Sequence, residues 1–514
     1  MNRPASGLPA TRPASGLPVR AVVIGAGVGG LATAARLAHR GVETVVLEQS
    51  HILGGKLGIV RRDGFSFDIG PSLVTMPHVF DDLFAQTGGP SDLTFDRLPV
   101  ACRYRFPDGT ELDMPGRAQE IPAALDSALG AGAGAQWSRF SERAEQIWDA
   151  THEAFLESPI GPRELVSLSR RVGDLRTISP WSSLRDLGRQ YLTDPRLAMM
   201  LDRYATYTGS DPRRAPAALA TVPHVEQRWG SWHVPGGLHR IAEAIADRAT
   251  SLGAEIRTGV TVTGVRVENG RTTGVDTTHG PVAADIVVAN ADAEQVYRSL
   301  VPATRRTALA RRRLDATTAS LSGFVILLAL RGRDADTPHH RVLFPDDYDA
   351  EFDAVFGTRT RPAHPADAPT VYVSAPDDPA LRPDDDTEAW FVLVNAARHG
   401  TGSSALVDWD APELSEGYAD RILDVIAARG VDVRERVLWR EIISPADLMR
   451  RTMTPGGSIY GTSSNGATAA FLRPANRSPI PGLFLVGGSS HPGGGLPLVT
   501  LSAQIVDELI ADAL

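Results

Sequence analysis

The chain has 514 residues, of which 42% are hydrophobic, and a formal net charge of −9 at pH 7. Its length allows about two to four domains with a sizeable core, and its acidic balance argues against wholesale nucleic-acid binding. Cys102 is the only cysteine, which excludes an intramolecular disulfide or a cysteine-cluster metal site and fits a reducing cytosol. We predict no metal site and, because no apolar run approaches about 18 residues, no membrane-spanning helix.

The N-terminal segment contains a Pro- and Gly-rich unit that occurs twice, as Arg3–Pro9 and as Arg12–Pro18. It lacks the apolar stretch that a secretory signal needs. We therefore predict a disordered tail over residues 1–18.

A strand–turn–helix pattern follows this tail. A run of β-branched residues leads into Gly25-x-Gly27-x-x-Gly30, and a helix rich in Ala and Leu is predicted over Leu31–Arg40. The glycines permit a tight turn, close approach of the backbone to a pyrophosphate and close packing of helix on strand. The free N–H groups of the first helical turn can bind phosphate. The pattern predicts dinucleotide binding; a plain βα turn is the alternative.

The next strand supplies a second signal for a dinucleotide. It is predicted over Thr44–Leu47 and ends at Glu48, which is placed to accept hydrogen bonds from ribose hydroxyls. Gly54 and Gly55 then bring bare backbone near Glu48, and Lys56 is expected to neutralise phosphate charge.

From residue 76 to 220 the sequence is mostly helical. Large apolar side chains such as Trp148 and Met199 predict a helical core, and the alternative is a long apolar cavity or a membrane-facing surface. The Gly-Ala segment Gly130–Ala135 is expected to be a flexible linker. The predicted helices are Glu120–Leu129, Trp137–Leu156, Pro162–Arg170, Leu184–Tyr191 and Arg196–Tyr204.

Residues 221–300 are predicted to belong to the same domain as the βαβ unit at the start of the chain. An amphipathic helix over Arg240–Leu252 precedes three short strands, and Ala284–Ala291 has the composition of a buried parallel strand. The opening βαβ unit is therefore expected to be completed more than 200 residues later, with a helical region inserted between its parts.

A second inserted region is predicted over residues 301–475. Its expected strands are Ser322–Leu330, Thr370–Ser374 and Ala389–Asn395, with a helix over Leu414–Arg429. A cluster of arginines is predicted to form a solvated helix face, and attraction to an anionic bilayer is the alternative. The cluster consists of Arg305, Arg306, Arg311, Arg312 and Arg313.

The C-terminal segment repeats the strand–glycine–helix pattern. A strand ends at Gly487-Gly488, a glycine-rich loop containing His491 follows, and a helix is predicted over Val499–Ala511. A free helix N-terminus is thus expected beside the cofactor.

Together these segments resemble the bacterial phytoene desaturase family of carotenoid desaturases, which are FAD-dependent flavoproteins of the amine-oxidase-like superfamily. The resemblance covers residues 19–514. The motifs that carry it are GAGVGGLATAARL, LEQSHILGGK, FDIGP, VPGGLHRIAEAIA, ADIVVANADAEQVY, MTPGGSIYG and RPANRSPIPGLFLVGGSSHPGGGLP.

The resemblance implies FAD as the cofactor and assigns residues to it. Val262 is expected to contact the adenine through its backbone, and the segment with Gly488, Pro497, Leu498 and Val499 is expected to flank the ribityl and isoalloxazine groups. Related flavoproteins often have Gly-Asp where this chain has Gly487-Gly488, so the ribityl hydroxyls must bond to backbone or to another side chain. The positions implied for the ADP-ribose are Gly25, Gly27, Gly30, Glu48, Gln49, Gly55 and Lys56.

The predicted fold is α/β, with a discontinuous Rossmann-like FAD-binding domain, an inserted α+β substrate domain and a helical membrane-facing region. The FAD-binding domain is assigned to residues 19–75, 221–300 and 476–514. The helical region is assigned to residues 76–220 and the substrate-binding domain to residues 301–475.

The resemblance implies introduction of C=C bonds into a polyene. A polyene hydrocarbon has no acidic proton, so desaturation needs a hydride acceptor, here the flavin, and a separate loss of a proton. His491 is the candidate for a catalytic or orienting role, and local packing is the alternative. Oxygen or a quinone is expected to reoxidise the flavin.

Three alternatives stay open at this point. One is a downstream carotenoid oxidoreductase, namely a hydroxycarotenoid 3,4-desaturase, a ketolase or oxygenase, or an isomerase. A second is an amine oxidase, which needs an aromatic cage that the C-terminal motif does not supply. A third is a non-catalytic prenyl-lipid binding protein of the GDP-dissociation-inhibitor type.

An insoluble substrate implies access from a membrane. We therefore expect a cytoplasmic protein that associates peripherally with the inner face of the membrane. The helices of residues 76–220 and the arginine cluster are the candidate contacts.

Overall fold

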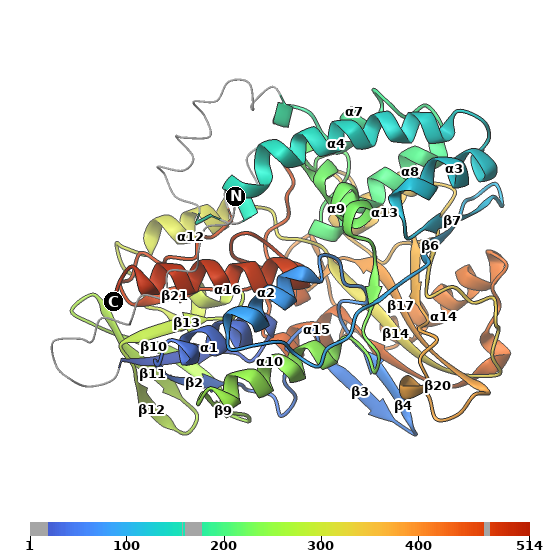
Figure 1. The fold of residues 1–514 in the computed structure, drawn as a ribbon. Helices are drawn as coiled ribbons and strands as arrows, with labels where there is room; N and C mark the ends of the chain where they lie inside the picture. Colours follow the sequence, from blue (N-terminus) through green and yellow to red (C-terminus); the bar gives the residue numbers. More distant parts are fainter. Residues whose placement is uncertain (1–18, 157, 160–176, 467–472) are drawn as a thin grey trace.

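The computed structural model describes residues 19–156, 158–159, 177–466 and 473–514. The predicted tail over 1–18 and the predicted helix over Pro162–Arg170 lie outside these residues. The described chain forms two large sheets, of five and seven strands, each packed against helices (Figure 1).

The five-stranded sheet is parallel throughout and has the order β21-β13-β1-β2-β9. Its central strand comes from the first residues described, whereas three of its other strands lie more than 200 residues later, one of them more than 400 residues later. The predicted α/β fold with a discontinuous Rossmann-like domain is therefore confirmed. The strands are β1 (Arg20–Ile24), β2 (Glu43–Leu47), β9 (Glu255–Arg257), β13 (Ile286–Ala289) and β21 (Leu483–Leu485).

Alternate residues of β1 face opposite sides of this sheet. Ala21 and Val23 pack with the helices α1 (Val28–His39), α10 (His239–Ser251) and α16 (Leu496–Ala511). Val22 and Ile24 pack instead toward a small antiparallel sheet. Burial on both faces explains why these strands are apolar without alternation. The small sheet consists of β10 (Val262–Glu268), β11 (Arg271–Thr277) and β12 (Gly280–Ala283).

The seven-stranded sheet has the order β20-β14-β17-β16-β15-β6-β7. All neighbours pair antiparallel except β15 and β6, which are parallel. Two of its strands belong to the predicted helical region and five to the predicted substrate domain, so both inserted segments build one sheet. The strands are β6 (Val100–Arg105), β7 (Glu111–Pro115), β14 (Ser322–Arg331), β15 (His340–Leu343), β16 (Val371–Ser374), β17 (Thr387–Ala396) and β20 (Val437–Ile443).

A layer of helices covers the β6–β7 end of this sheet and forms the upper right of Figure 1. Its core includes Trp137, Phe140 and Tyr204, which are almost fully buried. The layer consists of α3 (Ile121–Leu129), α4 (Ala133–Leu156), α7 (Leu184–Gly188), α8 (Pro195–Arg203) and α9 (Thr221–Trp229), with α13 (Tyr348–Phe356) beside it.

The segment Gly130–Ala135 is not the flexible linker that its composition predicts. The carboxylate of Asp126 accepts hydrogen bonds from the backbone N–H groups of Gly132 and Gly134 at 2.9 and 2.8 Å, and α4 begins within the segment. A Cβ at Gly134 would lie 2.3 Å from the carbonyl oxygen of Pro122. These glycines therefore allow a close, ordered helix–helix connection.

The two faces of the β14–β17 part of the sheet are covered differently. On one face Phe324 and Trp390 pack with α14 (Leu414–Ala428). On the other, Val325 and Leu327 pack with the hairpin of β3 (Ile59–Arg62) and β4 (Phe65–Asp68), which the alternating residues Ile59–Phe67 about the Asp63-Gly64 turn predict. The remaining elements are α2 (His78–Gln86), β5 (Asp96–Arg97), β8 (Trp232–His233), α11 (Ala293–Gln295), α12 (Ala308–Asp315), β18 (Arg398–His399), β19 (Leu406–Val407) and α15 (Pro445–Thr452).

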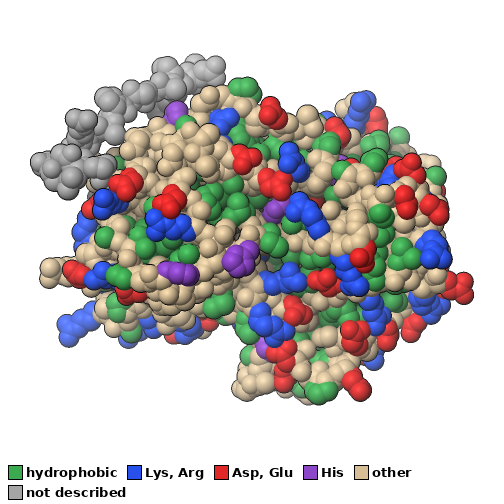
Figure 2. All heavy atoms as spheres, turned by 90° about the horizontal axis from the view of Figure 1, so that it is seen from below, with side chains coloured by type: hydrophobic (Ala, Val, Ile, Leu, Met, Phe, Trp, Pro, Cys, Tyr) green, Lys and Arg blue, Asp and Glu red, His purple; other side chains and the backbone are tan. Residues whose placement is uncertain are grey.

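No helix of the described residues combines the length and the apolar character needed to cross a bilayer. On the face seen in Figure 2, acidic and basic side chains lie intermixed with apolar ones and are not gathered by sign.

Gly30→Ala is expected to lower the free energy of unfolding by about 3 kcal/mol. A Cβ at this position would lie 2.2 Å from the carbonyl oxygen of Gly25. Gly417→Ala is the matched control, because Gly417 also lies in a helix but a Cβ there meets no atom within 4 Å. The free energy of unfolding of the control is expected to increase by about 0.5–1 kcal/mol. Urea unfolding followed by circular dichroism measures both, and equal effects would show that the Gly25 turn does not constrain position 30.

Candidate functional site

The glycine turn between β1 and α1 lies at the carboxyl edge of the parallel sheet. Gly25 has a φ of +89°, which is the left-handed region that favours glycine. A Cβ on Gly25 would lie 2.7 Å from the carbonyl oxygen of Asn290, and one on Gly27 would lie 2.7 Å from its Nδ2 atom. Glycine is thus required at both positions because a side chain there would clash with Asn290, in addition to any need to accommodate a ligand.

Asn290 directly follows β13 and connects the turns of three strands. Its Nδ2 lies 3.3 Å from the carbonyl oxygen of Gly25, and its backbone N–H donates to Ile24. A Cβ on Gly487, just after β21, would lie 2.7 Å from the Oδ1 of Asn290. Sequence reasoning placed the end of a strand here but gave the side chain no role.

Two helix N-termini open toward the same place. α1 begins after Gly27 and α16 after Gly495, and neither helix has a side-chain cap or an acidic residue in its first turn. The first N–H groups of an α-helix have no partner within the helix. Both ends are therefore suited to bind anionic groups such as phosphates.

Glu48 follows β2 and is buried. Its two carboxylate oxygens accept hydrogen bonds from the backbone N–H groups of Ala26, at 2.7 Å, and Ser50, at 2.8 Å. Since an ionised carboxylate has about four acceptor positions, both oxygens retain room for a ribose hydroxyl. Glu48 thus holds the glycine turn and is also available to a ligand.

The segment after Glu48 includes three more predicted cofactor-binding residues, Gln49, Gly55 and Lys56. A Cβ on Gly55 would lie 3.2 Å from the Cα of Gly27, so the two glycine segments are in close contact. The Nζ of Lys56 donates to the carbonyl oxygens of Ser458 at 3.0 Å and Ile459 at 2.6 Å. Burial lowers the pKa of Lys56 to about 8, and nearby Asp292 opposes this shift. Lys56 therefore ties the FAD-binding domain to the second inserted segment.

All the predicted cofactor-binding residues except Gly30 line one cavity of about 580 Å³. This volume falls within the range of about 300–1,000 Å³ that is usual for small-molecule and cofactor sites. Gly30 does not line the cavity but packs closely against Gly25 and Asn290. The residues that line the cavity are Gly25, Gly27, Glu48, Gln49, Gly55, Lys56, Val262, Gly488, Pro497, Leu498 and Val499.

The same cavity continues between the helices and the seven-stranded sheet. Trp148 and Val225 line it from α4 and α9, while Val325, Phe391 and Leu393 line it from β14 and β17. The large apolar residues on the helices therefore contribute both to a core and to a cavity wall.

His491 does not line this cavity. Its side chain is fully buried, and its Nε2 lies 2.9 Å from the carbonyl oxygen of Ser158. Its own carbonyl oxygen accepts hydrogen bonds from Asn476 and Ser502, both at 2.8 Å. These contacts hold the glycine-rich loop in place, and a catalytic role for His491 stays a prediction.

Asp292 of the cavity wall and the buried Arg473 are charged residues that sequence reasoning missed. Asp292 lines the cavity, and its Oδ2 is buried with no hydrogen-bond partner among the described residues. Burial raises the pKa of this carboxyl, and Lys56 opposes the shift. Arg473 donates to the carbonyl oxygen of Gly488, and burial lowers its pKa to about 10. Asp292 lies just after a parallel strand, as Glu48 does, which is the signal that could have identified it.

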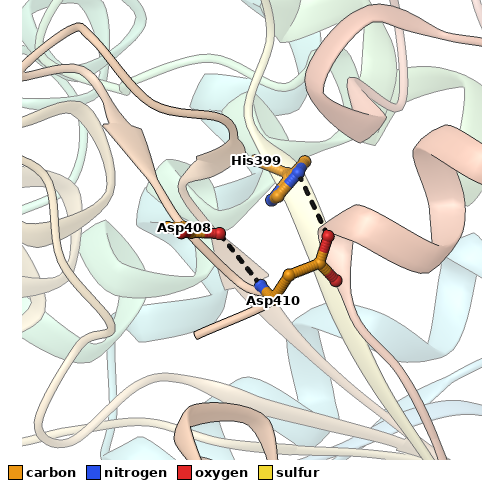
Figure 3. A group of neighbouring side chains, drawn as sticks. All are labelled: His399, Asp408 and Asp410. Atoms are coloured by element: carbon orange, nitrogen blue, oxygen red, sulfur yellow. Dashed lines mark hydrogen bonds and ion pairs between the residues drawn. The ribbon is translucent and has the colours of Figure 1, made fainter. Parts of the chain in front are cut away.

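One group of metal-ligating residue types, His399, Asp408 and Asp410, lies outside the cavity (Figure 3). The Nδ1 of His399 accepts the backbone N–H of Trp409, and Asp408 accepts the N–H of Asp410. Both oxygens of Asp410 lie 3.0 Å from the guanidinium of Arg450. The three side chains therefore stabilise the turn around β19 with their own hydrogen bonds and ion pairs.

Residues 28–393 match the family model described as flavin containing amine oxidoreductase. The chain belongs to this family, and FAD is its cofactor. It is 32% identical to 4,4'-diapolycopene oxygenase of Methylomonas sp., over 96% of this chain and 98% of the relative. It is 33% identical to hydroxyneurosporene desaturase of Rubrivivax gelatinosus, over 96% of this chain and 93% of the relative.

Solved structures show the same fold. An oxidoreductase from Methanosarcina mazei is similar with a TM-score of 0.62 at 17% identity, over 95% of this chain and all of the other. At this identity the likeness extends to the fold alone.

The residues present fit FAD. The glycine turn, two uncapped helix ends and the carboxylate of Glu48 meet in one cavity, where any side chain at the glycines would clash with backbone or with Asn290. Phosphates fit the helix ends and ribose fits the carboxylate.

Glu48→Gln is expected to weaken FAD binding by about ten- to a hundredfold. Hydrogen bonds to a charged group contribute about 1.5–3 kcal/mol, and the Gln amide places a donor where Glu48 accepts from Ala26 or Ser50. Flavin release during dialysis, followed by absorbance, measures the change. Glu268→Gln on the exposed end of β10 is the control. Equal flavin retention in both variants would contradict the role given to Glu48.

Proposed function

We propose that the chain is an FAD-dependent desaturase of carotenoid-type polyenes. One observation carries the proposal: a single cavity joins the FAD-binding glycine turns to an apolar chamber against the seven-stranded sheet. The similarity to a diapolycopene oxygenase and a hydroxyneurosporene desaturase, which extends over nearly the whole chain, supports this substrate class.

The bound FAD supplies the hydride acceptor that oxidation of a C–C bond needs. The chain's own residues orient the polyene and exclude water. Phe391, Leu393 and Val225 line the chamber and leave little for the substrate except apolar contact. Asp292 is a carboxylate of the cavity wall with a free oxygen and a raised pKa, so it can take up a proton. Oxygen or a quinone is the proposed terminal acceptor.

A downstream carotenoid oxidoreductase is the second candidate, in place of a phytoene desaturase. The relatives' names favour it, because both refer to compounds other than phytoene. An amine oxidase is disfavoured by the apolar wall of the chamber, to which Val225, Phe391 and Leu393 contribute. A non-catalytic prenyl-lipid binder is disfavoured by the complete glycine and Glu48 site.

The proposal predicts a yellow holoenzyme whose flavin band bleaches anaerobically when a carotenoid substrate is added. The chain should also change the pigments of cells that accumulate phytoene or a later carotenoid, as read by chromatography of extracts. Conversion of phytoene identifies a phytoene desaturase, and conversion of a later carotenoid alone identifies the downstream enzyme.

A colourless protein that binds prenyl lipids and changes no pigment would contradict the proposal. Bleaching by amines but not by polyenes would favour the amine oxidase instead.

We further propose peripheral contact with an anionic membrane through α12. Leu309 on this helix is 59% exposed, and Arg312 and Arg313 are exposed on its last turns. An exposed apolar side chain among basic ones suits the headgroup region of an anionic bilayer. Such contact would bring the protein to the membrane that holds an insoluble polyene.

The double variant Arg312→Glu and Arg313→Glu is expected to reduce binding to phosphatidylglycerol vesicles by about tenfold or more, since each basic residue near an anionic surface contributes about 1 kcal/mol. Cosedimentation at low salt measures it. The control is Arg359→Glu with Arg361→Glu, which places the same charge change in the exposed loop after α13. Equal losses would contradict a specific role for α12, and so would binding that high salt does not weaken.

A further inference from the structure

The cavity contains polar groups near α13 that hydride transfer does not require. Tyr348 and Thr370 both line it, and they are 5% and 7% exposed. Neither hydroxyl has a hydrogen-bond partner among the described residues. Other buried hydroxyls without a partner, such as those of Ser231 and Thr273, do not line this cavity. A buried, unpaired polar group costs about 1–3 kcal/mol, so two such groups facing one cavity suggest a ligand.

Glu351 arranges the groups around this point. It lies one turn after Tyr348 in α13, and its carboxylate accepts the backbone N–H of Thr370 at 2.8 Å and the side-chain amide of Asn395 at 2.6 Å. Because the amide nitrogen of Asn395 faces Glu351, its carbonyl oxygen is left as an acceptor. Asn395 lines the same cavity. The cavity wall thus offers two hydroxyls and one amide oxygen.

The ring of Tyr348 is held by aromatic neighbours. Its centroid lies 5.5 Å from that of Phe344 and 5.1 Å from that of Phe352. Burial raises the pKa of Tyr348 well above its usual value, so the hydroxyl keeps its proton and can donate it in a hydrogen bond. Tyr348 therefore presents a polar tip on a fixed apolar body.

Two charged residues of the cavity wall, Arg203 and Glu226, are already matched. Arg203 donates to the hydroxyls of Tyr104 at 3.0 Å and Tyr207 at 2.9 Å, and Tyr207 in turn donates to Glu226 at 3.2 Å. This chain of hydrogen bonds links a buried guanidinium to a buried carboxylate. The site consequently favours a neutral ligand over a carboxylate or an amine.

We propose that Tyr348, Thr370 and Asn395 bind a terminal hydroxyl group of the substrate, so that this chain acts on a polyene that is already hydroxylated near one end. A hydroxyl can donate to the Asn395 oxygen and accept from Tyr348 or Thr370, whereas a carbonyl can only accept. The inference rests on the proposed function and specifies its substrate class.

The test compares two polyenes of equal length, one with a terminal hydroxyl and one without, on the flavin-loaded protein. The ratio of their kcat/KM values is expected to favour the hydroxylated polyene at least tenfold, because a site built to hydrogen-bond a hydroxyl rejects the analogue that lacks it. Tyr348→Phe should reduce this ratio about tenfold, and the isosteric Thr370→Val should reduce it in the same direction. Flavin absorbance per protein verifies that the variants are folded.

Tyr418→Phe is the matched control. Its hydroxyl is also buried, but the ring packs against Phe324 and Trp409 in another core and does not line the cavity. The control should leave the ratio unchanged.

The possible outcomes separate this inference from the proposed function. Equal kcat/KM for the two polyenes, unaltered in Tyr348→Phe, would overturn the hydroxyl site and leave the desaturase proposal standing. A preference for the hydroxylated polyene that persists in both Tyr348→Phe and Thr370→Val would also overturn the site. Conversion of neither polyene by a fully flavinated protein would overturn the function and the inference together.

Discussion

The close contact of Asn290 with two glycine turns is the constraint on which the rest of the site depends. Its backbone carbonyl oxygen fills the space that a Cβ at Gly25 would need, and its side chain fills the space of a Cβ at Gly27 or Gly487. These glycines follow β1 and β21, which lie on either side of β13 in the sheet but far apart in the chain. Close packing here leaves the backbone N–H groups at the surface of the turn, where a phosphate can reach them.

The two insertions follow from this arrangement. Once β1, β13 and β21 are adjacent, the intervening chain must leave the parallel sheet and return to it twice. Both excursions contribute strands to the same seven-stranded sheet, and the cavity lies where that sheet faces the glycine turns. Lys56 spans this boundary through its bonds to the carbonyl oxygens of Ser458 and Ile459. The predicted cofactor-binding residues and the apolar chamber therefore line one cavity instead of two separate pockets.

The sequence was most informative where the signal was local. The turn from Gly25 to Gly30, the acid at Glu48 and the hairpin at β3–β4 all depend on residues within one supersecondary unit, and the structure contains each of them. The role of Asn290 could not be predicted, because it requires the pairing of β1 with β13 across more than 200 residues. The parallel pairing of β6 with β15 is equally non-local. Glycine content alone also cannot distinguish a flexible linker from a tight connection of the kind that Asp126 holds.

The cavity changes in chemistry along its length, and this gradient constrains the ligands that it can hold together. At the glycine turns, backbone N–H groups and helix dipoles favour negative charge. In the chamber, Phe391 and Leu393 offer only apolar contact. Beside α13, the hydroxyl of Tyr348 is polar but uncharged. A hydrocarbon would satisfy only the middle of this gradient, because it would leave the buried hydroxyls without partners at a cost of about 1–3 kcal/mol each. A cofactor with phosphates matches the glycine turns, and a long apolar chain with a neutral oxygen at one end matches both the chamber and the hydroxyl of Tyr348.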